Sequence, residues 1–250
     1  MSDTNIPLTK GKLIEQVRLH DHRDPHRPES RLSDVILGGQ DGLVNVLGVI
    51  LGVAAATQDA RIVIAAGLAA TFAESISMGA VAYTSTLAND DLYLSERERE
   101  YRHIHLAPDV EIEEIRDIYR NKGFEGETLE KIVEVITSNP EVWVNVMMSE
   151  EFQMTPPQKS NAWGSALIVG FSALIGSFIP LFPFFFWSTS LSIWISIVIA
   201  ALTLFVVGVY KARVTIGNPF RSGMQMAAIG TISALAGYVV GLIFKVPAVP

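Results

Sequence analysis

The sequence predicts an all-α integral membrane protein with five transmembrane helices and an acidic helical insert between the second and third. Two observations support this fold class. Hydrophobic residues make up 49% of the 250 residues and charged residues only 18%, with a mean hydropathy of +0.33, whereas soluble domains have about a quarter of their residues charged. The apolar residues also form five stretches of roughly the 20 residues that a bilayer requires, at about 35–57, 62–88, 163–187, 191–210 and 224–244.

Composition excludes several classes of protein. There are no cysteines, which excludes a disulfide scaffold, a thiolate zinc site, an iron–sulfur cluster and a catalytic thiol. The net charge of −7 argues against nucleic acid as a partner. Residues 1–33 are polar and do not resemble a signal peptide, so we expect them to form a cytoplasmic tail.

The distribution of lysine and arginine predicts the orientation. Seventeen of these residues lie in the tail, between the second and third spans, or between the fourth and fifth, and only Arg61 and Lys245 lie on the opposite side. Because basic residues favour the cytoplasmic side of short loops, we expect the N-terminus in the cytoplasm and the C-terminus outside. The domains are then the tail (1–33), spans one and two (34–88), a cytoplasmic metal-binding insert (89–159) and spans three to five (160–250).

The insert differs sharply from the spans. It contains 17 acidic and eight basic side chains, a local balance of −9. The pattern predicts that residues 90–106 continue the second span, and that further helices run from Pro108 to Gly123, over 126–138, and from Pro140 to about Met154.

Potential metal ligands recur at helical spacing within the insert. Residues three or four apart share a helix face, and carboxylate, imidazole and thioether together suit a divalent first-row metal. The candidate ligands are Glu100, His103, Glu111, Glu114, Met147, Met148 and Glu151. Two alternatives stay open: residues 96–100 are an ordinary solvated stripe, and the two methionines belong to the core beside Trp143 and Val144.

Two acidic residues lie within the spans, where charge is costly and marks function by default. Asp41 and Asn45 follow helical spacing in span one, and Glu74 and Met78 do so in span two, with Glu74 roughly 22 Å from the cytoplasmic end. We interpret these four residues as the lining of a route for a transition-metal ion. Glycines of span one, from Gly38 to Gly52, permit close approach by another helix, and we expect that helix to be a second copy of the chain. The alternative is that the acids only tie helices together.

Over residues 33–246 the chain resembles the vacuolar iron transporter family. The motifs that carry the resemblance are Asp41-Gly42-Leu43-Val44, Ser77-Met78-Gly79, the turn at Pro180–Pro183, and Asn218-Pro219-x-Arg221-Ser222-Gly223. The resemblance implies a homodimer that moves cytosolic ferrous iron, and often manganese, out of the cytosol in exchange for protons. It also implies a path at the dimer interface through Asp41 and Met78, and metal binding by Glu100, Glu111, Glu114, Met147, Met148 and Glu151.

The chain departs from the plant members of that family at two positions. His103 replaces an insert glutamate and introduces a ligand that titrates near neutral pH. The span-two glutamate falls at Ala70, while Glu74 lies one turn further along on the same face. We interpret Glu74 as a relocated substitute.

The sequence therefore predicts a proton-coupled secondary transporter rather than an enzyme. Its substrate is Fe²⁺, with Mn²⁺, Co²⁺ and Zn²⁺ also compatible with the donors, and no prosthetic group is expected. Its membrane is a prokaryotic plasma membrane or a vacuolar membrane. Two alternatives remain: a membrane-anchored, ferritin-like di-metal oxidase or iron-binding protein, and a structural membrane scaffold.

Overall fold

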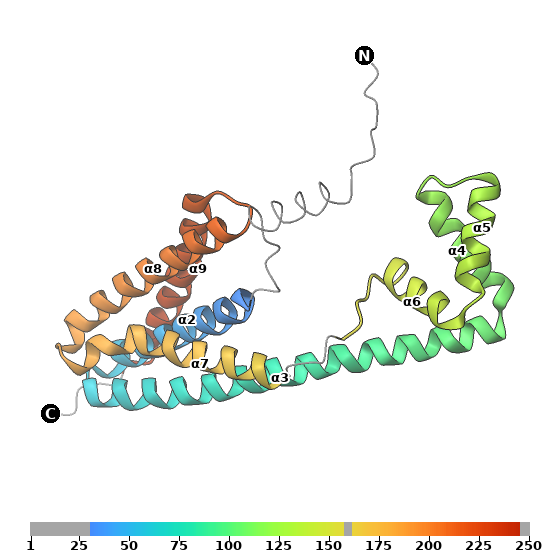
Figure 1. Cartoon of the computed structure of the whole chain (residues 1–250). Coiled ribbons are helices and arrows are strands. Elements are labelled where there is room, and N and C mark those ends of the chain that lie inside the picture. The colour runs from blue at the N-terminus through green and yellow to red at the C-terminus, as the bar shows by residue number, and fades with distance from the viewer. Residues whose placement is uncertain (1–30, 158–161, 246–250) are drawn as a thin grey trace, which may run out of the picture. The chain divides into compact units, whose positions relative to one another are not determined.

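The computed structural model describes residues 31–157 and 162–245, and those residues form helices and no strands. The predicted tail lies almost entirely outside the described residues. The membrane bundle consists of α2 (Leu32–Thr57), the first part of α3 (Ala60–Leu106), α7 (Ala162–Leu181) with the short helix η1 (Phe182–Phe185), α8 (Thr189–Val214) and α9 (Pro219–Ile243) (Figure 1). The insert consists of the last part of α3, α4 (Pro108–Asn121), α5 (Gly126–Thr137) and α6 (Pro140–Glu150).

Five helices are long and apolar enough to cross a membrane, as the sequence predicts. Their ends differ from the predicted ones because hydropathy locates the apolar middle of a helix rather than its caps. The helix α9 begins earlier than expected, at Pro219, since the side chain of Asn218 accepts a hydrogen bond from the Arg221 amide and caps the first turn. The third span ends earlier, at Phe185, where Pro183 lies in the short helix η1.

The helix α2 contributes the largest share of the bundle's core. Its buried side chains Leu43, Leu47 and Ile50 belong to one apolar cluster with Leu181 and Leu204 of neighbouring helices. Its glycines allow backbones to meet. A β-carbon on Gly42 would overlap the carbonyl oxygen of Ala173, on α7, and a β-carbon on Gly52 would come within 2.9 Å of the carbonyl oxygen of Gly237, on α9.

These glycine contacts correct one expectation from the sequence. The close approach that the glycines permit is used by α7 and α9 of the same chain, so it is not free for a second copy. The interpretation that Gly38 to Gly52 form the dimer contact is therefore wrong. A dimer contact on α2 would have to use the remaining exposed face, which includes Asn45 and Val49.

The second span and the first helix of the insert are one helix, α3, of 47 residues, which confirms the predicted continuation. Asp59 caps its start by accepting a hydrogen bond from the Arg61 amide at 2.8 Å. The helix ends at Leu106, two residues before a proline, because proline disfavours helical backbone in the residue that precedes it.

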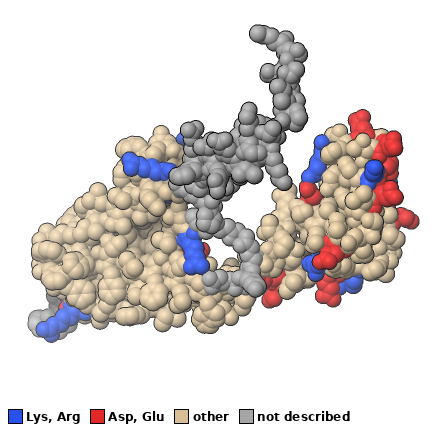
Figure 2. Space-filling model, viewed as in Figure 1, with Lys and Arg blue, Asp and Glu red and all other residues tan. Residues whose placement is uncertain are grey.

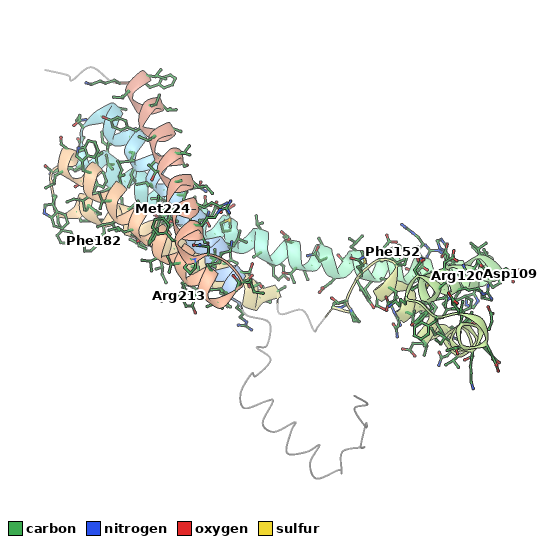
Figure 3. All side chains as sticks on the ribbon, turned by 90° about the horizontal axis from the view of Figure 1, so that it is seen from above. Asp109, Arg120, Phe152, Phe182, Arg213 and Met224 are labelled. Carbon is green, nitrogen blue, oxygen red and sulfur yellow. The ribbon has the colours of Figure 1, made fainter. Side chains whose placement is uncertain are left out.

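The insert encloses a small apolar core of its own. Ile115 of α4, Leu129 of α5 and Val144 of α6 are buried in one cluster with residues of α3. Most charged side chains visible in Figure 2 lie on the insert, whereas the visible face of the bundle is mostly uncharged, with a few lysine or arginine side chains. The side chains of Asp109 and Arg120 project from α4 within this polar region (Figure 3). The last helix, α6, ends at Glu150, so the predicted end near Met154 is wrong: Gln153 already has a left-handed φ of 53°.

Candidate functional site

Three of the predicted insert ligands form a compact group. Glu100 and His103 lie three residues apart on α3, and Glu111 lies in the first turn of α4, which the Pro108 turn folds back toward α3. His103 Nδ1 is 3.4 Å from Glu100 Oε1 and 3.5 Å from Glu111 Oε1. One ligand atom from each residue lies within 4.8 Å of the others, which is compatible with one shared metal ion.

The two carboxylates of this group are buried. Glu100 is 2% exposed and Glu111 is 5% exposed, and the Oε2 atom of each is buried with no hydrogen-bond partner among residues 31–157 and 162–245. Burial raises the pKa of Glu100, and burial together with the charges of Glu114 and Glu100 raises the pKa of Glu111 to about 7. A buried carboxylate is ordinarily paired or bound to a metal, so this group is short of positive charge.

The other insert candidates are two glutamates, Glu114 and Glu151, and two methionines, Met147 and Met148. Burial raises the pKa of Glu151, and the charges of Glu114 and Glu100 add to the rise, so four acidic side chains interact electrostatically. Met147 and Met148 are fully buried in the core of the insert, in the same cluster as Trp143 and Val144. This placement agrees with the core interpretation of the methionines, and their binding of metal stays a prediction.

One acidic neighbour was missed by the sequence analysis. Glu96 lies one turn before Glu100 on α3, its side chain is 13% exposed, and it pairs with Arg99 at 2.8 Å. Its charge also contributes to the raised pKa of Glu100. The solvated-stripe alternative is therefore wrong for Glu100 and Glu96, although Glu98 is exposed as that alternative expects. The four-residue spacing of these glutamates was the available signal.

In the bundle, Asp41, Asn45 and Glu74 meet. Asn45 Nδ2 donates a hydrogen bond to Asp41 Oδ2 at 3.2 Å and another to Glu74 Oε1 at 3.1 Å. The cause is the hairpin of α2 and α3, which are separated only by Gln58 and Asp59. Asn45 and Glu74 lie at comparable distances from this turn, about 20 Å at 1.5 Å per residue, so antiparallel packing places them at one level.

This intramembrane trio is open to the surface of the chain. Asn45 is exposed, while Asp41, Glu74 and Met78 are half-buried. Met78 lies one turn after Glu74 on α3. Hydrocarbon offers no partner to polar groups, so polar side chains at this depth require a protein surface or water against them.

The family model and the relatives named below cover the helices described above. The model of the VIT family matches residues 32–242. The chain belongs to the VIT family. Vacuolar iron transporter 1 of Tulipa gesneriana is 32% identical over 88% of this chain and 90% of its own length. Vacuolar iron transporter 1 of Oryza sativa subsp. japonica is 33% identical over 90% and 92% respectively. The vacuolar iron transporter of Plasmodium berghei is 30% identical over 97% and 96%.

The match to the VIT family covers both groups of acidic residues described above. The matched region begins at the start of α2 and ends within the last turn of α9, so the five spanning helices and the insert belong to the same family unit. Membership in the family thus agrees with the resemblance found in the sequence.

Proposed function

We propose that this chain moves divalent transition-metal ions, ferrous iron first, out of the cytosol across its membrane in exchange for protons. The names of the VIT relatives, vacuolar iron transporter, support iron as the substrate. Manganese, cobalt and zinc also suit the donor atoms. The observation that carries the proposal is the meeting of Asp41 and Glu74 at one amide within spanning helices.

The transport path in this proposal runs past Asp41, Asn45, Glu74 and Met78. Two ionised carboxylates held this close in a medium of low dielectric repel each other. A divalent cation or protons must therefore accompany them, and exchange of one for the other is the coupling step. The thioether of Met78 favours transition metals over calcium or magnesium.

The insert collects metal on the cytoplasmic side in this proposal. Glu100, His103 and Glu111 form its centre, and their buried, unpartnered oxygens support binding of a cation. Glu114, Glu151, Met147 and Met148 complete the proposed set of ligands. The orientation rests on the lysine and arginine distribution, which favours a cytoplasmic insert and an external C-terminus. The relatives' names favour a vacuolar membrane.

We further propose that the protein works as a homodimer. The support is the exposure of Asn45 beside half-buried Asp41 and Glu74, since a second copy on this face would enclose the trio. An Asn45→Cys variant, in a chain without other cysteines, should cross-link to its twin in native membranes. Absence of any cross-link with short bifunctional reagents would contradict this arrangement.

The oxidase alternative is less well supported. A ferritin-like di-iron site takes its carboxylates and histidines from four long helices, whereas α4, α5 and α6 have 14, 12 and 11 residues. It also leaves Asp41 and Glu74 without a role. A purely structural scaffold gives no reason for either acidic group.

Uptake into sealed proteoliposomes tests the proposal. With an imposed pH gradient the wild type should accumulate Fe²⁺ or Mn²⁺, and Asp41→Asn should abolish accumulation, because it removes one charged ligand. Asp41→Asn should leave metal binding by the insert unchanged. Transport by Asp41→Asn at the wild-type rate would refute both the path and its coupling.

A further inference from the structure

The amide of Asn45 occupies an unusual position. Its nitrogen donates to a carboxylate on its own helix and to another on α3, and a carboxamide nitrogen has only two hydrogens to give. Both donors are therefore used to hold Asp41 and Glu74 together. Because both partners are acceptors, the nitrogen rather than the oxygen must face them when they are ionised.

The other end of the same amide is unused. No described residue donates a hydrogen bond to Asn45 Oδ1, and the side chain lies on the exposed face of α2. Rotation about its last bond exchanges nitrogen and oxygen with little change in shape. An amide oxygen is a good ligand for a divalent cation, whereas an amide nitrogen with its hydrogens is not.

We propose that Asn45 alternates between two states, positioning the two carboxylates in one and binding the metal ion in the other, an inference that rests on the proposed transport function. In the empty state its N–H groups bridge Asp41 and Glu74 and offset part of their repulsion. In the loaded state the amide turns, and Oδ1 joins the two carboxylates around the metal ion. The bridge thus keeps the pair assembled between cycles, and its opening accompanies cation entry.

Isosteric substitutions separate the two roles. Asn45→Asp keeps an oxygen in place of Oδ1 but removes both donors and adds a charge. The site then contains three carboxylates and should bind cations more tightly. We expect KM for Mn²⁺ to fall about fivefold and the maximal rate to fall with it, because release slows. Asn45→Leu keeps the approximate shape but removes both donor and ligand, so KM should rise about tenfold, the cost of one interaction of roughly 1.4 kcal/mol.

Ile76 provides the control. It lies on α3 two residues after Glu74, its side chain is exposed, and residues two apart on a helix do not share a face. Ile76→Val should leave KM and the maximal rate unchanged. Size-exclusion profiles of all three variants should match the wild type, which excludes misfolding as the cause of a change.

The result to look for is movement of KM in opposite directions for Asn45→Asp and Asn45→Leu. If Asn45 only fills space, Asn45→Leu will transport with wild-type KM and rate, and the inference fails while transport itself stands. A shift of KM in the same direction for both variants also overturns it. If wild-type protein moves no metal in these vesicles, the proposed function fails instead.

Discussion

Two sites along the single helix α3 have the same arrangement of polar groups but differ in how far these groups are buried. In the insert, His103 Nδ1 lies 3.4 and 3.5 Å from one oxygen of Glu100 and of Glu111. In the bundle, Asn45 Nδ2 lies 3.2 and 3.1 Å from one oxygen of Asp41 and of Glu74. Each site therefore has a nitrogen between two carboxylates from consecutive helices.

The two sites differ in which groups are buried. The carboxylates of the insert are buried by the chain's own core, and it is the bridging His103 that is exposed, at 46% of its side chain. In the bundle the carboxylates are only half-buried and Asn45 is exposed. The insert thus encloses its acidic group within one chain. The bundle leaves its site on a surface that lipid cannot satisfy, which is the reason for proposing a second copy there.

The chemistry of the bridging nitrogen also differs. A neutral imidazole nitrogen can itself bind a metal ion, whereas a carboxamide nitrogen with its hydrogens cannot. The bridge of the insert is therefore a potential ligand as it stands, while the bridge of the bundle would have to present its oxygen. A carboxamide carries no titrating proton, so in the proposed exchange the two carboxylates of the bundle would have to carry the protons.

The largest expected effect comes from breaking the insert site alone. The double variant Glu100→Gln with Glu111→Gln removes both buried charges while keeping shape, and metal binding by the full-length protein in detergent should weaken by at least about tenfold. Calorimetry with Mn²⁺ measures this change. Transport through the bundle should persist at saturating metal, because Asp41 and Glu74 are untouched.

Glu98→Gln is the control for this variant. Glu98 lies on the same helix but is exposed, and among the described residues it pairs only with Arg102, at 3.6 Å. Its loss should therefore leave affinity within about twofold of the wild type. Equal weakening by the control and by the double variant would mean that the insert binds metal only through its general negative charge. The parallel between the two sites would then be without function.

A smaller effect should follow from changing how α2 packs. Gly42→Ala places a methyl group against the backbone carbonyl of Ala173 on α7, and overpacking of this kind costs about 1–3 kcal/mol. Gly39→Ala is the matched control, since its β-carbon would lie 3.6 Å from the carbonyl oxygen of Ser172, an ordinary contact. Thermal unfolding in detergent should show a lower Tm for the first variant only.

Equal Tm values for both alanine variants would show that α2 and α7 adjust freely. The insert's metal affinity should be unchanged in either variant, since its core is formed by other residues. The comparison therefore separates the stability of the bundle from the binding chemistry of the insert.

Most of the fold could be predicted from the sequence because hydropathy and proline positions are local signals. The five spans, the continuation of span two into the insert, and the start of α4 at Pro108 are confirmed. Helix ends were less predictable. They depend on caps such as Asn218, and on backbone choices such as the left-handed Gln153, which composition does not indicate.

The sites were predicted only as sets of residue types. Spacing placed Glu100 and His103 on one face, but it could not show that Glu111 folds back to them or that Glu96 is partly buried beside them. The same limit applied to the glycines of α2. Their spacing indicated close helix packing, whereas which helix packs there depends on tertiary contacts with α7 and α9.

The smallest expected effect is a dependence of the insert's stability on pH. Burial and neighbouring carboxylates raise the pKa of Glu111 to about 7 from an ordinary value of 4.5, so the folded insert binds a proton more readily than the unfolded chain does. The stability that this proton provides is complete below pH 4.5 and is lost as the pH rises through about 7. Glu100 and Glu151 have pKa values raised in the same direction.

Without metal, amide hydrogen exchange in α4 should therefore become faster between pH 5.5 and pH 8 than intrinsic exchange rates account for. The helix α8, which has no acidic residue, serves as the internal reference. Added Mn²⁺ should restore protection more strongly at pH 8 than at pH 5.5, because ionised carboxylates bind it. In Glu111→Gln this acceleration of exchange in α4 should be smaller, since the amide does not titrate. An equal pH dependence of amide exchange in α4 and α8 would mean that the insert tolerates its buried charges without a proton or a metal ion. The contrast with the open site in the bundle would then have no electrostatic basis.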